Sequence, residues 1–117
     1  YPDIVPAVCV CNETQVHWSA HRSPLDRLIE AVRRVRAGVS VPVTVADNFA
    51  YWRDHGADLA EMLDFITVHT YAIWERKDID EGLSYTVANY EDGATFSVSG
   101  TGVTASEGCS YCHEEQE

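Results

Sequence analysis

The chain has 117 residues, of which 45% are hydrophobic and 23% are charged, a composition that suits one globular domain with a buried core. Its formal net charge is −11, from 8 basic and 19 acidic residues, so its field repels phosphate backbones and excludes nucleic acid as an expected partner. No apolar run approaches the ~20 residues of a membrane span. The chain opens with Tyr1 and shows no signal peptide, so we expect an excised piece of a longer protein, with its localisation left open.

The first predicted elements are a strand and a helix. Residues 7–11 (AVCVC) form an apolar run without alternation, which is typical of a parallel strand covered on both faces. We interpret Cys9 and Cys11 as small core residues on one face of that strand. A helix with apolar residues at helical spacing is expected to start at Ser23, as N-cap, and to stop at Gly38.

Two further strand–helix units follow along the chain. Strands are expected at 41–46 and 65–68, with a weaker helix near 58–63 and a second helix from 78 to 90. Three such units in succession predict parallel strands and an α/β fold.

The character of the sequence changes after Tyr90. The text becomes rich in Gly, Ser and Thr and loses both periodicities, so we expect an irregular tail over 91–117. Short strands at 96–98 and 103–105 are its only candidate elements.

Polar side chains follow each of the three predicted strands. They are Asn12-Glu13, Asp47-Asn48 and His69-Thr70-Tyr71. Because the carboxyl ends of parallel strands meet at one edge, we expect these groups to form a site. A glutamic acid that leaves a buried strand is partly desolvated, which favours its protonated form and suits general-acid catalysis. The alternative is that Glu13 simply caps a loop.

Several blocks of the sequence resemble the family 17 glycoside hydrolases, the β-1,3-glucanase family, in its bacterial-type branch. The blocks are VCVCNET at 8–14 with WSAHR at 18–22, VPVTVAD at 41–47, and DFITVHTYAIWE at 64–75. The similarity covers roughly positions 1 to 90, in order and with natural spacing. It implies that this part of the chain is a partial (β/α)8 TIM barrel of about three strand–helix units.

The resemblance also implies roles for individual residues. Glu13 would be the general acid/base at the end of a barrel strand, and Asn12 would hydrogen-bond the sugar 2-hydroxyl. Tyr71 and Trp74 would line sugar subsites, with a rim or core aromatic as the alternative for Trp74. His69 would orient a sugar hydroxyl or the carboxylates, or act as a structural residue, and Asp47 would be a polar lining residue. The substrate would be a β-glucan, we expect a β-1,3-glucan, and no cofactor is implied.

The chain departs from the family pattern at several points. Cys11 stands where Gly usually precedes the Asn-Glu pair, and a complete barrel needs about 250 residues. The motif that carries the nucleophile is not intact, and Glu107 is the nearest candidate. Back-translated with common codons and read one nucleotide later, residues 110–117 spell Pro-Thr-Ala-Thr-Arg-Ser-Lys, which resembles the text that follows Gly-Trp in this family. We therefore hypothesise a frameshift after about Tyr90.

A competing motif lies in the tail. Cys109, Cys112 and His113 match the Cys-x-x-Cys-His pattern of covalent haem attachment, and the same residues are candidate zinc ligands. Only four residues follow the motif, which leaves little chain to enclose a haem. The favoured hypothesis is therefore a piece of a retaining glycoside hydrolase or transglycosylase, and the alternative is a catalytically inactive partial α/β domain.

Overall fold

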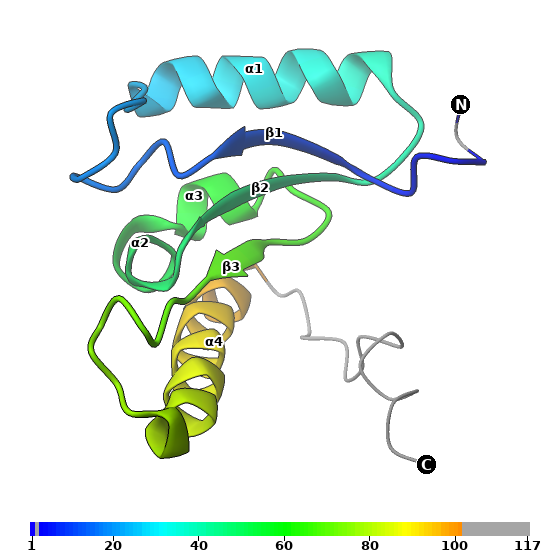
Figure 1. Cartoon of the computed structure of the whole chain (residues 1–117). Helices are drawn as coiled ribbons and strands as arrows, with labels where there is room; N and C mark the ends of the chain where they lie inside the picture. Colours follow the sequence, from blue (N-terminus) through cyan, green and yellow to red (C-terminus); the bar gives the residue numbers. More distant parts are fainter. Residues whose placement is uncertain (2, 102–117) are drawn as a thin grey trace.

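The computed structural model of the chain describes Tyr1 and residues 3–101, with side chains placed through Gly93. Three parallel strands form one sheet in the order β1-β2-β3, which confirms the predicted α/β class with parallel strands (Figure 1). The elements in chain order are β1 (Val8–Asn12), α1 (Leu25–Gly38), β2 (Val43–Asn48), α2 (Phe49–His55), α3 (Ala57–Ala60), β3 (Thr67–His69) and α4 (Ile79–Thr101).

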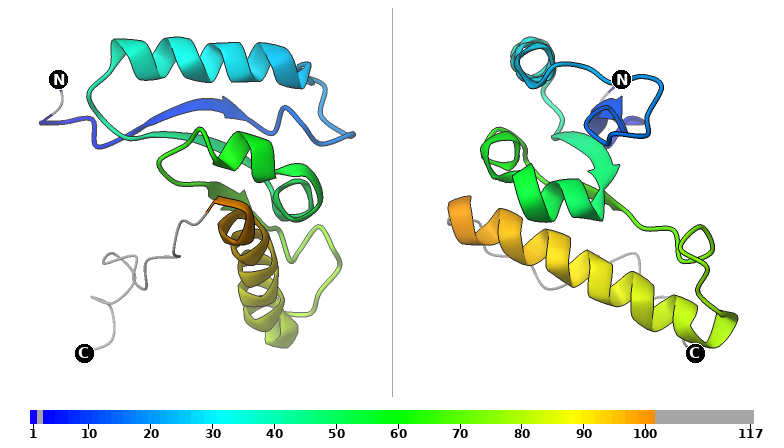
Figure 2. Two further views of the ribbon diagram at one scale, coloured as in Figure 1. Left: turned by 180° about the vertical axis from the view of Figure 1, so that it is seen from behind. Right: turned by 90° about the vertical axis from the view of Figure 1, so that its left-hand side faces the viewer.

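The core lies around the central strand. All six residues of β2 are buried, as expected of a strand between two neighbours with helices packed over it. Leu28 and Val32 of α1 and Trp52 of α2 are almost fully buried in this core. The Trp52 indole N–H donates to the Thr67 carbonyl oxygen at 3.1 Å, so this large ring is buried without an unpaired polar group. The helix α1 packs on β1 and β2, and α2 packs on β2 and β3 (Figure 2).

The start of α1 differs from the prediction. The helix begins at Leu25, Pro24 is the boundary residue, and among the described residues no side chain caps it, so the expected N-cap at Ser23 is wrong. The Pro24 carbonyl accepts the first backbone N–H groups, those of Arg27 and Leu28, at 3.1 and 3.2 Å. Ser23 lies one residue too early, and its hydroxyl instead faces the Pro24 carbonyl at 3.5 Å.

Two short helices fill the segment between β2 and β3. The sequence patterns missed α2, which begins directly after β2 and has only seven residues. Asn48 caps it, since its Oδ1 accepts the Ala50 N–H at 2.9 Å. The helix expected near 58–63 is present as a single turn, α3.

The last helix is longer than predicted. It continues to Thr101, so the expected strand at 96–98 is wrong, and so is the expected irregular tail as far as Thr101. The second predicted strand, at 103–105, lies outside the described residues. α4 packs chiefly on α2, with Tyr85 and Gly93 facing that helix, and Asn89, one turn from each, reaches the loop after β3. Tyr85 packs edge-on against Phe49, and the Asn89 amide donates to Thr70 Oγ1 at 2.9 Å.

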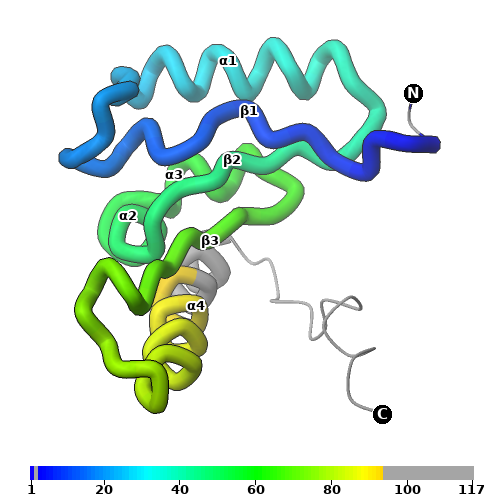
Figure 3. Tube along the Cα trace, viewed as in Figure 1, coloured from blue at the N-terminus to red at the C-terminus, as the bar shows by residue number. Residues whose placement is uncertain are grey.

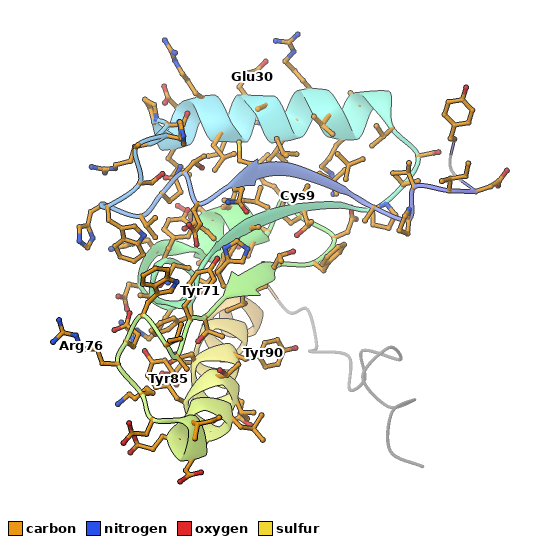
Figure 4. The ribbon with its side chains drawn as sticks, viewed as in Figure 1. Cys9, Glu30, Tyr71, Arg76, Tyr85 and Tyr90 are labelled. Atoms are coloured by element: carbon orange, nitrogen blue, oxygen red, sulfur yellow. The ribbon has the colours of Figure 1, made fainter. Side chains whose placement is uncertain are left out.

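A second face of α4 carries an apolar stripe that is exposed. Its members are Ile79, Leu83, Val87 and Tyr90, and Leu83 is 78% exposed. Tyr90 projects away from the helix in Figure 4. Within the described part of the chain, no helix combines the length and apolar character needed to cross a membrane.

Candidate active site

The strand β1 contains an extra residue between Cys9 and Asn12, shortly before Glu13. Cys9 pairs with Thr44 and Asn12 pairs with Ala46, so β1 advances by three residues where β2 advances by two. Such a bulge breaks the regular alternation of side chains and re-aims those that follow it. This explains why Cys9 is exposed while Cys11 packs on the core, against the expectation that both are core residues on one face.

Glu13 leaves the sheet in a left-handed backbone conformation. Its φ is 49°, a region that costs energy for residues other than glycine and is found where the surrounding structure enforces it. Its backbone N–H still donates to the Ala46 carbonyl oxygen of β2 at 2.9 Å. The strand end is therefore anchored while the side chain turns out of the sheet. Asn12 beside it is exposed at the same strand end.

Three predicted site residues meet at this end of the sheet. His69 Nδ1 lies 2.9 Å from Glu13 Oε1, and the Tyr71 hydroxyl lies 3.2 Å from the same nitrogen. Glu13 follows β1, whereas His69 ends β3, so the contact joins the two outer strands of the sheet. The pKa of Tyr71 is raised, first by burial and then by its hydrogen bond to the Glu13 carboxylate and the charge of that group.

The proton positions in this cluster are constrained because Glu13 and Tyr71 contact the same nitrogen of the His69 ring, Nδ1. His69 Nδ1 carries at most one hydrogen, so it either donates to the Glu13 carboxylate or accepts from another group. When it donates to Glu13, the Tyr71 hydroxyl also has that carboxylate as its acceptor. When Glu13 is protonated, its O–H donates to a bare Nδ1. The same 2.9 Å contact is therefore compatible with both forms of the carboxyl group.

Asp47 occupies a different place from the one predicted. Its side chain is completely buried, so the interpretation as a residue lining a substrate surface is wrong. Its Oδ2 accepts the Gln15 N–H at 3.0 Å, and its Oδ1 accepts the Asn48 N–H at 2.8 Å. Burial raises the pKa of Asp47, the backbone N–H groups of Asn48, Gln15 and Thr14 lower it, and the charge of Glu13 raises it slightly further. The net direction is upward.

Exposed aromatic rings lie on the loops at this end of the sheet. Trp74 is 79% exposed on the loop after β3, and Trp18 is largely exposed on the loop after β1. Both loops leave the same, left-hand end of the sheet in Figures 1 and 3. Tyr71, labelled in Figure 4, belongs to the same loop as Trp74 and lies near the sheet. The sequence patterns did not assign Trp18 a role, although a tryptophan five residues after Glu13 was the available signal.

Four of the predicted functional residues lie in the last part of the chain. Glu107, Cys109, Cys112 and His113 are outside the described residues. Among the described residues, no group of three or more His, Cys, Asp or Glu side chains is placed to hold a metal ion.

Comparisons of the chain with models of protein families, with curated proteins and with solved structures find no match.

Proposed function

We propose that the chain is part of a retaining glycoside hydrolase or transglycosylase that acts on β-glucans, with β-1,3-glucan as the expected substrate. The observation that carries the proposal is the 2.9 Å contact between Glu13 and His69 at the carboxyl end of the sheet, with Tyr71 beside it. Parallel α/β folds place their catalytic groups at this end. The resemblance of the sequence to family 17 glycoside hydrolases supplies the reaction class, and the parallel strands are compatible with part of a (β/α)8 barrel.

Glu13 is assigned as the general acid/base. In the first step it donates a proton to the glycosidic oxygen while a second carboxylate attacks the anomeric carbon. In the second step it removes a proton from the incoming water or sugar hydroxyl. The contact with His69 can hold the Glu13 side chain in both forms, because Nδ1 accepts from the protonated acid in one imidazole tautomer and donates to the carboxylate in the other. Retention requires the two carboxyl groups to lie about 5–5.5 Å apart, and Glu107 remains the candidate nucleophile.

The surrounding residues are assigned to substrate binding. Asn12, exposed beside Glu13, would hydrogen-bond the sugar 2-hydroxyl. The exposed ring of Trp74 offers an apolar face of the size of a pyranose ring. No cofactor is part of this chemistry.

The experiment is turnover of a soluble β-1,3-gluco-oligosaccharide by the chain at high protein concentration. We expect slow turnover, because an open sheet does not hold two carboxylates to catalytic tolerance. Glu13→Gln should lower the turnover by about 10²-fold or more, the range of a general acid/base. The matched control is Glu30→Gln, a carboxylate on the outer side of α1, which should leave turnover unchanged (Figure 4).

Binding provides the second readout when turnover is too slow to measure. The oligosaccharide at millimolar concentration should shift the NMR signals of the Trp74 indole and the His69 ring. Equal turnover in wild type and Glu13→Gln would contradict the proposal. So would the absence of turnover together with unchanged Trp74 and His69 signals.

The second candidate is a catalytically inactive partial α/β domain. It is favoured by the exposed apolar stripe of α4 and by the sheet edges, since within the described residues β1 and β3 each pair with β2 alone. Open edges and apolar faces favour association. This candidate predicts self-association without glucan turnover or binding.

A further inference from the structure

The buried carboxylate of Asp47 bridges two neighbouring strand ends. It lies at the end of β2, has no exposed surface, and accepts one backbone N–H on each oxygen. The Asn48 bond is local, but the Gln15 bond spans 32 residues and reaches the turn that follows β1. A carboxylate without solvent contact is costly unless such donors satisfy it, so these bonds hold the residue in place.

The residue tied by this bond lies two positions after Glu13. Glu13 has a φ of 49°, a strained conformation that relaxes unless both sides of it are held. On the strand side, the Glu13 N–H is held by the Ala46 carbonyl. On the turn side, the Gln15 N–H is held by Asp47, and the Gln15 side-chain amide donates to the Ser23 carbonyl at 3.1 Å.

We propose that Asp47 is a positioning residue for Glu13: its buried carboxylate fixes the Glu13–Gln15 turn and thereby directs the Glu13 side chain toward His69. A role of Asp47 in catalysis rests on the proposed function, whereas its role in directing the Glu13 side chain does not. Both oxygens are engaged as acceptors, so an amide cannot replace the carboxylate. In Asp47→Asn the NH₂ group would face one of the two backbone N–H donors and leave it without an acceptor.

The test compares Asp47→Asn with a matched control, Asp64→Asn, by NMR without substrate. Asp64 also accepts a backbone N–H, that of Val43 at 2.8 Å, but at the opposite end of β2. Two readouts are taken in each variant: the hydrogen-exchange rate of the Gln15 amide and the ¹⁵N pattern of the His69 ring, which reports the proton shared with Glu13. We expect Asp47→Asn to speed Gln15 exchange by about tenfold or more and to change the His69 pattern.

The control separates positioning from general stability. Asp64→Asn should leave the His69 pattern as in wild type even where it lowers stability. An unchanged His69 pattern in folded Asp47→Asn, or the same change in both variants, would overturn the proposal. If Asp47→Asn does not fold, wild-type protein decides: a Gln15 amide that exchanges at the rate of an unprotected loop overturns the proposal, and a protected one supports it. Absence of both glucan turnover and glucan binding would contradict the proposed function without altering these substrate-free readouts.

Discussion

The helices α1 and α4 carry similar apolar stripes and bury them differently. In α1 the stripe includes Leu28 and Val32, which are almost completely buried against β1 and β2. In α4 the stripe of Leu83 and Val87 is exposed, and the helix is attached through its other face, by Asn89 and its neighbours. Helical spacing of apolar residues therefore predicts that a helix forms, but burial depends on which element packs against it.

The largest expected difference between the two regions is in the response to leucine truncation. Leu28→Ala should lower the free energy of unfolding by about 2–5 kcal/mol, because it opens a cavity in the core. Leu83→Ala should change it by no more than about 0.5 kcal/mol, since that side chain is 78% exposed. Urea denaturation followed by circular dichroism measures both values. Similar losses in the two variants would mean that the α4 stripe is covered in solution.

Glycine substitutions should differ in sign between the core around Trp52 and the helix α4. A Cβ added to Gly56 would lie 2.6 Å from Trp52 Cε3 and 2.8 Å from the Trp52 carbonyl oxygen, so Gly56→Ala should cost about 1–3 kcal/mol. A Cβ added to Gly82 of α4 would meet only the Ala72 Cβ at 3.8 Å, so Gly82→Ala should stabilise the protein by about 0.5–1 kcal/mol. Thermal unfolding midpoints report both signs. A midpoint raised by Gly56→Ala would contradict the close packing of Gly56 on Trp52.

The smallest of these effects concerns Tyr51 in the core. Its hydroxyl is buried and has no hydrogen-bond partner within the described part of the chain, and burial raises its pKa to about 12. Tyr51→Phe should therefore raise the free energy of unfolding by ~1 kcal/mol at neutral pH, because it removes an unpaired buried polar group.

The same residue gives an alkaline signature. Because the pKa of Tyr51 is higher in the folded state, ionisation of this group favours the unfolded chain: the stability of the wild type is unaffected by it below pH 10 and falls as the pH rises toward about 12. Wild type should lose this component over that range and Tyr51→Phe should not. Parallel stability profiles for the two proteins between pH 10 and 12 would show that Tyr51 ionises as easily in the folded state as in the unfolded chain.

The sequence predicted the elements whose signals are local. The apolar runs gave the three parallel strands, and the spacing of Leu28 and Val32 with the Gly38 stop gave α1. The helix α2 was missed because seven residues are too few for a periodic pattern, and its capping residue, Asn48, follows a strand directly. The end of α4 was misjudged because its Gly-, Ser- and Thr-rich text has weak helix propensity, yet the helix continues to Thr101.

The residues of the candidate site were predicted from the sequence, but the positions of only some of them were. Strand ends predicted that Glu13 and His69 would lie at one edge, and the structure brings them to 2.9 Å. The burial of Asp47 was not predictable. A polar residue at the end of a strand gives the same sequence pattern whether its side chain faces solvent or accepts N–H groups from a neighbouring turn. Whether these residues perform glycoside chemistry stays a proposal.

The extra residue in β1 has a consequence for the direction of every side chain beyond it. Ahead of the bulge, odd and even positions of the strand keep one assignment to the two faces of the sheet, and past it the assignment is exchanged. Shortening β1 by one residue between Cys9 and Asn12 would restore plain alternation while Cys9 still pairs with Thr44 and Asn12 with Ala46, so the Glu13 side chain would keep its side of the sheet. The side of the sheet on which this carboxylate lies is therefore set by the pairing of Asn12 with Ala46, and a residue can be removed from the bulge without reversing it.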